Sequence, residues 1–159
     1  MFTDTVRDEL RGYSLAWHKP PTHCHYDDNR TDIAVHIRRG DVTAAKFAKR
    51  FSDARLFAAQ INKLRASTKG KGKGKGAVHF HIFSETEPLE LKEAGIIPRG
   101  DTTFHKGMRG MDTFHCFVRA DVLVCDKSTF STSAAILSRG IVYDRNSDRN
   151  GLSSYKQWH

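Results

Sequence analysis

The stretch Ile33-Ala-Val-His-Ile-Arg-Arg-Gly-Asp-Val42 decides the fold of this chain. Its first five residues, up to Ile37, are apolar apart from one histidine, which is typical of a buried strand. The apolar run then stops at Arg38 and Arg39, where a strand of an α/β sheet gives way to a loop. Ligands bind at that edge of such sheets, and an arginine can hold phosphate oxygens with two parallel hydrogen bonds. The motif therefore predicts an anion site at a strand end.

Strand-like and helix-like segments alternate along the rest of the chain. Apolar runs predict further strands at 77–83, 102–104, 120–125 and 141–143. Apolar stripes at helical spacing predict helices at 4–15, 88–94 and 112–119, a helix that follows an N-cap at Ser52, and one that ends before Gly140. Strand, helix and strand at this spacing predict an α/β fold, a mostly parallel sheet flanked by helices. We expect residues 1–31 to be a helix and loop that lead into one domain at 32–159.

The charge of the chain favours phosphorylated or polyanionic partners. In 159 residues, 26 Lys and Arg stand against 18 Asp and Glu, which gives a formal net charge of +8. Four of these lysines lie in the Lys-Gly tract at 69–76, so the rest of the chain carries only +4. Such a tract can neither bury surface nor hold a helix, and we expect it to be a flexible, solvated insertion.

The cysteines indicate a chain without a disulfide framework, and the N-terminus indicates a chain without a signal peptide. Cys24, Cys116 and Cys125 are odd in number and show no paired spacing. No apolar run is long enough for a membrane span, and the N-terminus is acidic where a signal peptide would be cationic and then apolar. We therefore expect a cytoplasmic protein. The adjacent His23, Cys24 and His25 cannot easily converge on one tetrahedral ion, so we also expect no metal site.

Three loops should meet at the carboxyl edge of the predicted sheet, because the ends of parallel strands line up there. The last of them enters a helix, whose free backbone N–H groups offer a second place for phosphate. Cations, hydroxyls and carboxylates together suit a nucleotide-sugar, and no glycine spacing of a P-loop or dinucleotide fold is present. The side chains in these loops are His36, Arg38, Arg39 and Asp41; Ser84 and Glu85; and Ser128, Thr129 and Ser131.

The same residues resemble a known family. The motif at 36–41, His-x-Arg-Arg-Gly-Asp after an apolar strand, is similar to the first motif shared by the α1,2-, α1,6- and protein O-fucosyltransferases. Residues 112–131 resemble a later motif of that superfamily, in which a helix ends in Ala-Asp, a strand follows, and a Ser-Thr-Phe-Ser turn opens the next helix. Between them, 83–88 is similar to a strand end where acidic residues precede a proline. The resemblance covers residues 7–143.

This resemblance implies the Rossmann-like, donor-binding half of a GT-B glycosyltransferase. Such an enzyme transfers fucose from GDP-fucose to a glycan or protein hydroxyl, with inversion and without a metal. By the resemblance, Arg38 and Arg39 would hold the diphosphate and stabilise the leaving GDP, and His36 would line the same pocket. The guanine would be read by Asp112 or Thr113, between which the motif does not decide, and the phosphates would be contacted by Ser131 and Thr132.

A carboxylate near the donor could accept the proton of the incoming hydroxyl. Asp41 and Glu85 are the candidates, but the superfamily has no uniform base, and the sequence favours neither.

One departure from the family concerns length. Superfamily enzymes carry a whole N-terminal half that shapes the acceptor site, whereas 35 residues precede His36 here. We expect the chain to hold the donor half, with the acceptor half absent or supplied by a second chain. As a fragment of a eukaryotic enzyme, it would belong to the Golgi or endoplasmic reticulum. The alternative is a non-catalytic basic domain that binds nucleic acid or another polyanion through 69–76, although the aromatic interleaving of specific nucleic-acid binders is missing.

Overall fold

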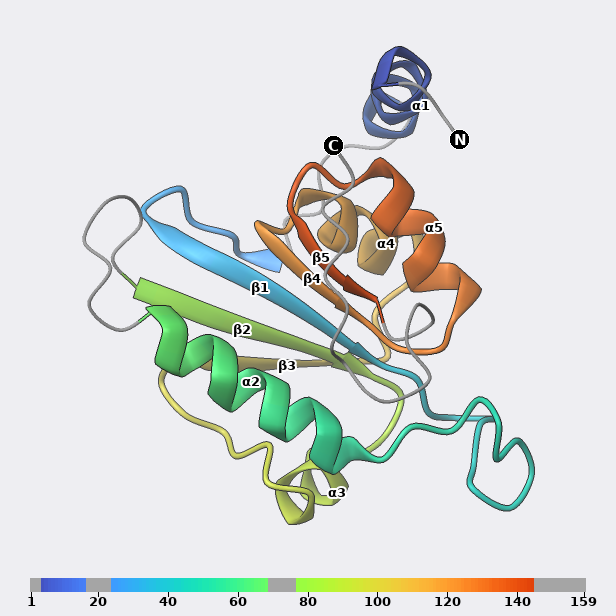
Figure 1. Cartoon of the computed structure of the whole chain (residues 1–159), viewed down its shortest axis with the longest axis vertical. Coiled ribbons are helices and arrows are strands. Elements are labelled where there is room, and N and C mark those ends of the chain that lie inside the picture. Colours follow the sequence, from blue (N-terminus) through green and yellow to red (C-terminus); the bar gives the residue numbers. More distant parts are fainter. Residues whose placement is uncertain (1–3, 17–23, 69–76, 145–159) are drawn as a thin grey trace.

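One five-stranded, entirely parallel sheet forms the centre of the molecule (Figure 1). The computed structural model describes residues 4–16, 24–68 and 77–144. The order of the strands is β3-β2-β1-β4-β5, so the chain winds outward from β1 in both directions, as in a Rossmann-like sheet. The prediction of a parallel α/β fold is confirmed. The strands are β1 (Arg30–Ile37), β2 (Ala77–Ser84), β3 (Thr102–Lys106), β4 (Val122–Cys125) and β5 (Ile141–Asp144).

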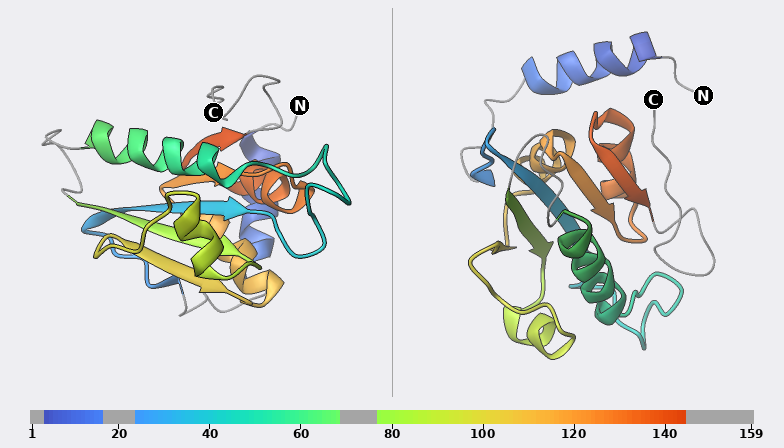
Figure 2. Two further views of the ribbon diagram at one scale, coloured as in Figure 1. Left: turned by 90° about the horizontal axis from the view of Figure 1, so that it is seen from below. Right: turned by 60° about the vertical axis from the view of Figure 1, so that its left-hand side comes forward.

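Helices cover both faces of the sheet (Figure 2). They are α1 (Asp4–Ala16), α2 (Ala54–Thr68), α3 (Pro88–Glu93), α4 (Gly110–Arg119) and α5 (Thr129–Leu137). The α2 and α3 helices pack on one face and α4 and α5 on the other. The α1 helix lies against α5, where Arg11 donates a hydrogen bond to the Leu137 carbonyl at 3.3 Å. None of the described helices is long and apolar enough to cross a membrane.

The two hydrophobic cores follow from the alternation of side chains along the strands. Ile33, Val35 and Ile37 of β1 pack under α2 against Phe57. Ala34 faces the other way, into a core that α4 and α5 complete. Because β1 is buried on both faces, its sequence is a nearly continuous apolar run rather than an alternating one.

Several predicted boundaries shift in the structure. The helix expected after Ser52 begins at Ala54, and Asp53 accepts the Arg55 backbone N–H at 2.9 Å. The prediction that Ser52 is its N-cap is therefore wrong: the Ser52 hydroxyl is buried and donates to Asp126 instead.

Gly140 is required by close packing, since a Cβ atom there would collide with the Ala120 and Asp121 backbone oxygens.

The sequence predicts no disulfide framework, but the structure contains one disulfide. Cys24 and Cys116 form a disulfide between positions 92 residues apart in sequence, and Cys125 is free and buried. The bond joins the segment before β1 to α4, so it depends on the fold and leaves no spacing pattern in the chain. The Lys-Gly tract at 69–76 and His23 lie outside the described residues.

Candidate functional site

A cavity of about 770 Å³ opens at the carboxyl edge of the sheet. It lies where the winding direction reverses, beside the end of β1, which is the usual ligand position in sheets of this kind. All three predicted loops reach it. The residues singled out from the sequence that line the cavity are His36, Arg38, Asp41, Ser84, Glu85, Thr113, Ser128, Thr129 and Thr132.

Three other predicted residues do not line this cavity. The Arg39 side chain is turned into the loop that follows β1, where its guanidinium donates to the Ser52 carbonyl at 2.9 Å and lies 4.6 Å from the centre of the Phe51 ring. The Ser131 hydroxyl is fully buried and donates to the Ser128 carbonyl. Asp112 lies on α4 outside the cavity lining, whereas its neighbour Thr113 belongs to it.

Arg38 reaches the cavity, but it is already paired with two carboxylates. Its Nη1 donates to Glu85 Oε1 at 2.5 Å, and its Nη2 forms an ion pair with Asp41. The second oxygen of Glu85 accepts the backbone N–H of Arg39 at 2.9 Å. The positive charge of Arg38 is therefore offset locally, while the orientation of its guanidinium is fixed.

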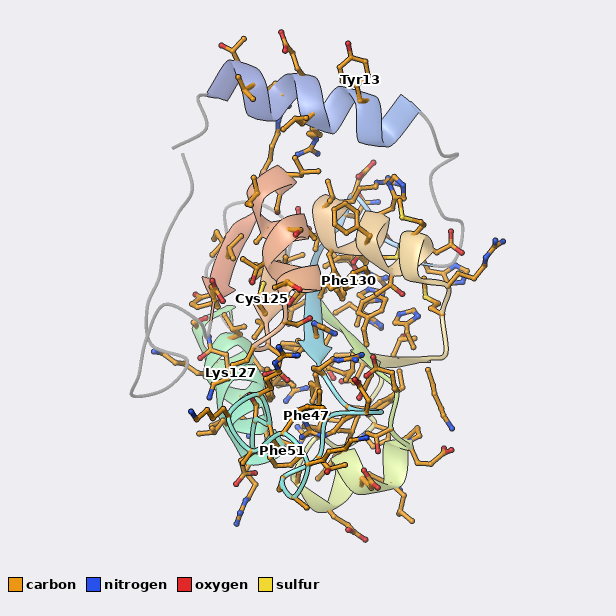
Figure 3. The ribbon with its side chains drawn as sticks, turned by 90° about the vertical axis from the view of Figure 1, so that its right-hand side faces the viewer. Tyr13, Phe47, Phe51, Cys125, Lys127 and Phe130 are labelled. Carbon is orange, nitrogen blue, oxygen red and sulfur yellow. A yellow bond between two sulfur atoms is a disulfide. The ribbon has the colours of Figure 1, made fainter. Side chains whose placement is uncertain are left out.

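Three further cations line the cavity and were not singled out from the sequence. Lys49, Arg50 and Lys127 make no ion pair with any described carboxylate. Lys127 Nζ donates to the Lys49 carbonyl at 3.2 Å, and Figure 3 shows Lys127 beside the loop that carries Phe47 and Phe51. A basic residue in a loop is usually a solvated surface residue, so only the position of Lys127, just ahead of the Ser128 turn, could have marked it. These cations add positive charge to the lining of the cavity.

The start of α5 adds backbone donors to the same wall. Ser128 precedes the first turn, and its side chain makes no capping hydrogen bond. Thr132 N–H bonds to the Ser128 carbonyl, whereas the N–H groups ahead of it in the first turn have no partner within the helix. Ser128 and Thr129 line the cavity, so the N-terminus of α5, the end of a helix that favours anions, faces it.

Asp126 holds the edge together, and sequence reasoning missed it. Its carboxylate is fully buried directly after β4. It accepts the backbone N–H of Arg38 at 2.8 Å and that of Lys127 at 2.7 Å, and the Ser52 hydroxyl also donates to it. One carboxylate therefore fixes the ends of β1 and β4 and the loop before α2. Its only sequence signal is an acidic residue that follows a buried strand.

His36 supplies a neutral imidazole to the cavity. The ring is 5% exposed and lies 5.2 Å from Phe117 and 6.1 Å from Phe130, centre to centre. Burial lowers the pKa of His36 to about 4, although the carboxylates of Asp126 and Glu85 act in the opposite direction. Its Nδ1 atom is buried and has no hydrogen-bond partner among the described residues. The ring is therefore uncharged at neutral pH.

No metal centre accompanies this cavity within the described parts of the chain, where no three His, Cys, Asp or Glu side chains form a group that could hold an ion. Comparison with protein-family models, with curated proteins and with solved structures finds no match to this chain. The cavity and its side chains therefore carry the functional inference.

Proposed function

We propose that this chain binds GDP-fucose in the cavity at the carboxyl edge of its sheet, as the donor-binding domain of a fucosyltransferase-like glycosyltransferase. One observation carries the proposal: three loops far apart in the sequence, each with part of the resembling pattern, line a single cavity. Its position beside β1 and the start of α5 suits a nucleotide diphosphate.

The diphosphate is assigned to the wall formed by α5 and the unpaired cations. Lys127, Lys49 and Arg50 supply positive charge there, and the first turn of α5 supplies N–H donors. In transfer, the acceptor oxygen bonds to the sugar carbon and its proton passes to solvent, while the bond from that carbon to the diphosphate breaks. Negative charge then develops on the leaving GDP, and cations already in place stabilise it without reorganisation.

The proposal divides the two arginines of the opening motif. Arg38 faces the ligand, and Glu85 and Asp41 hold its guanidinium in a fixed orientation. Arg39 is a positioning residue, because its guanidinium bonds to the carbonyls of the loop rather than to the cavity. Since Glu85 and Asp41 both pair with Arg38, neither is assigned the removal of the acceptor proton.

Calorimetry on the full chain with GDP, GDP-fucose and UDP tests this proposal. Lys127→Ala should weaken GDP binding about tenfold, since a charge-assisted contact contributes about 1.5 kcal/mol or more. Arg38→Ala should weaken it as well. Arg55→Ala is the matched control, because Arg55 is exposed, pairs with Asp53 and does not line the cavity.

Three results would overturn the proposal in different ways. Absence of GDP binding in the wild type would remove the nucleotide site, and equal affinity for UDP would remove the guanine assignment. A third pair of results would favour the alternative of polyanion binding through the Lys-Gly tract. In that case, deletion of residues 69–76 abolishes all nucleotide binding, whereas Lys127→Ala binds GDP with the affinity of the wild type.

A further inference from the structure

A chain of three side chains crosses the sheet and ends at the cavity. Asp32 lies on β1, His81 on β2 and His105 on β3, and these strands are neighbours. Asp32 Oδ1 is 3.0 Å from His81 Nε2, and His81 Nδ1 is 3.0 Å from His105 Nε2. Asp32 and His81 are buried, at 2% and 1% exposure, whereas His105 lines the cavity. None of the motifs in the sequence accounts for this arrangement.

The direction of the hydrogen bonds is set at the buried end. Asp32 also accepts from Arg30 Nε and from the Asp27 backbone N–H, each at 2.7 Å, so its carboxylate is the acceptor of the chain. His81 must then donate through Nε2, which leaves its Nδ1 to accept from His105 Nε2. Burial lowers the pKa of both His81 and His105 to about 4, so each ring carries one proton at neutral pH.

The two rings are also held in orientation by their packing. His105 stacks on Phe83, with 4.4 Å between ring centres and an angle of 11° between the planes. Tyr26 lies edge-on to His81 at 4.8 Å, and its hydroxyl donates to the carbonyl of Cys116, a member of the disulfide. These contacts fix the planes of the two rings, and the hydrogen bonds between Asp32 and His81 and between His81 and His105 fix which edge of each ring faces its neighbour.

We propose that Asp32 and His81 are positioning residues that fix the tautomer of His105, whose Nδ1 accepts a hydrogen bond from the nucleotide sugar in the cavity. This inference rests on the proposed function. The cations and α5 occupy the β1 and β4 side of the cavity and His105 the β3 side. The group that meets Nδ1 is therefore not the diphosphate but an N–H of the base or an O–H of a sugar, both of which are donors.

The tautomer itself can be measured without any ligand. Long-range nitrogen–proton NMR correlations of the histidine rings in the full chain should show the proton of His105 on Nε2 at pH 7, and that of His81 on Nε2 as well. In His81→Phe, which keeps a ring beside Tyr26, His105 should lose this fixed preference. A proton on Nδ1 of His105 in the wild type would overturn the inference.

Nucleotide affinity tests the contact. His105→Gln can still donate to His81 but has no acceptor in the place of Nδ1, and we expect about tenfold weaker binding. His105→Asn, whose amide oxygen can take that place, should recover part of the loss. His79→Gln is the matched control, because His79 bonds to Thr103 and does not line the cavity. Thermal melts show whether each variant is folded.

The outcomes separate this inference from the proposed function. An equal loss for GDP and GDP-fucose in His105→Gln supports a contact to the nucleoside, and a loss for GDP-fucose alone supports a contact to fucose. Unchanged affinity for both in a folded His105→Gln overturns the inference and leaves the proposed function standing. If the wild type binds neither GDP nor GDP-fucose, both the inference and the proposed function are overturned, even where the NMR shows the expected tautomer of His105.

Discussion

The two faces of the sheet differ in chemistry although they share the same strands. The face under α2 is built of hydrocarbon, with Ile33 and Val35 of β1 against Phe57. The opposite face has a hydrocarbon core of its own around Phe117 and Leu123, but it also carries the buried polar groups Asp32 and His36 on that same strand. Neighbouring residues of one strand thus face an apolar core on one side and a face with buried polar groups on the other, because side chains alternate between faces.

The largest effect is expected on the hydrocarbon face. Phe57 of α2 is completely buried, and Phe57→Ala should lower the free energy of unfolding by about 4 kcal/mol, since it removes apolar contacts and leaves a cavity. Denaturant unfolding measures the loss. Leu56→Ala on the same helix is the control: Leu56 is 37% exposed, and its truncation should cost about 1 kcal/mol or less. Equal losses at the two positions would contradict the assignment of Phe57 to the hydrophobic core under α2.

A disulfide links two distant parts of the chain on the opposite face. Replacing Cys24 and Cys116 together with alanine should destabilise the protein by about 3 kcal/mol, because the unfolded chain loses a cross-link between distant residues. The wild type treated with a reductant should show a similar loss. Alkylation of the unreduced, denatured protein should label one thiol, that of Cys125, and labelling of three thiols would contradict the pairing.

Acid should weaken the polar face through His36. The pKa of His36 is about 4 in the folded state and about 6.5 in an unfolded chain, so between these values the unfolded state binds more protons. Stability is therefore full above pH 6.5 and falls as the pH is lowered towards 4, with a loss of about 2 kcal/mol at pH 5 from His36 alone. Unfolding at pH 7 and pH 5 measures the loss.

His36→Phe separates this titration from the other acid-sensitive groups. A phenyl ring keeps the contacts with Phe117 and Phe130 and cannot be protonated. The variant should lose less stability than the wild type between pH 7 and pH 5. Identical pH profiles would show that protonation of His36 does not contribute to the loss of stability in acid.

The fold could be predicted from the sequence because its signals are local. The apolar run from Ile33 to Ile37 predicts a strand that is buried on both faces, and the alternation of strands and helices along the chain predicts a parallel sheet with helices on each side. The convergence of the loops followed from the parallel order of the strands. Boundaries such as the start of α2 shifted because a tertiary contact, that of Ser52 with Asp126, replaced a local cap.

The orientation of side chains at the site could not be predicted in the same way. Arg38 and Arg39 are equivalent in the sequence, and they diverge because the Ser52 carbonyl and the Phe51 ring, more than ten residues away, receive the Arg39 guanidinium. The Cys24–Cys116 pair and the chain from Asp32 to His105 likewise join residues of different elements. Such contacts exist only after the sheet has assembled, and no spacing along the chain encodes them.

The smallest effect is expected from a polar contact of the same face that lies away from the cavity. The Thr103 hydroxyl is 2.8 Å from His79 Nε2, and both side chains are half-buried. Thr103→Val keeps a β-branched residue in β3 and should cost about 1 kcal/mol or less, because water can replace the lost hydrogen bond. GDP affinity should not change. A loss near that of Phe57→Ala would mean that the contact between Thr103 and His79 stabilises the fold as much as the apolar packing of Phe57, and the contrast between the apolar and the polar face would then fail.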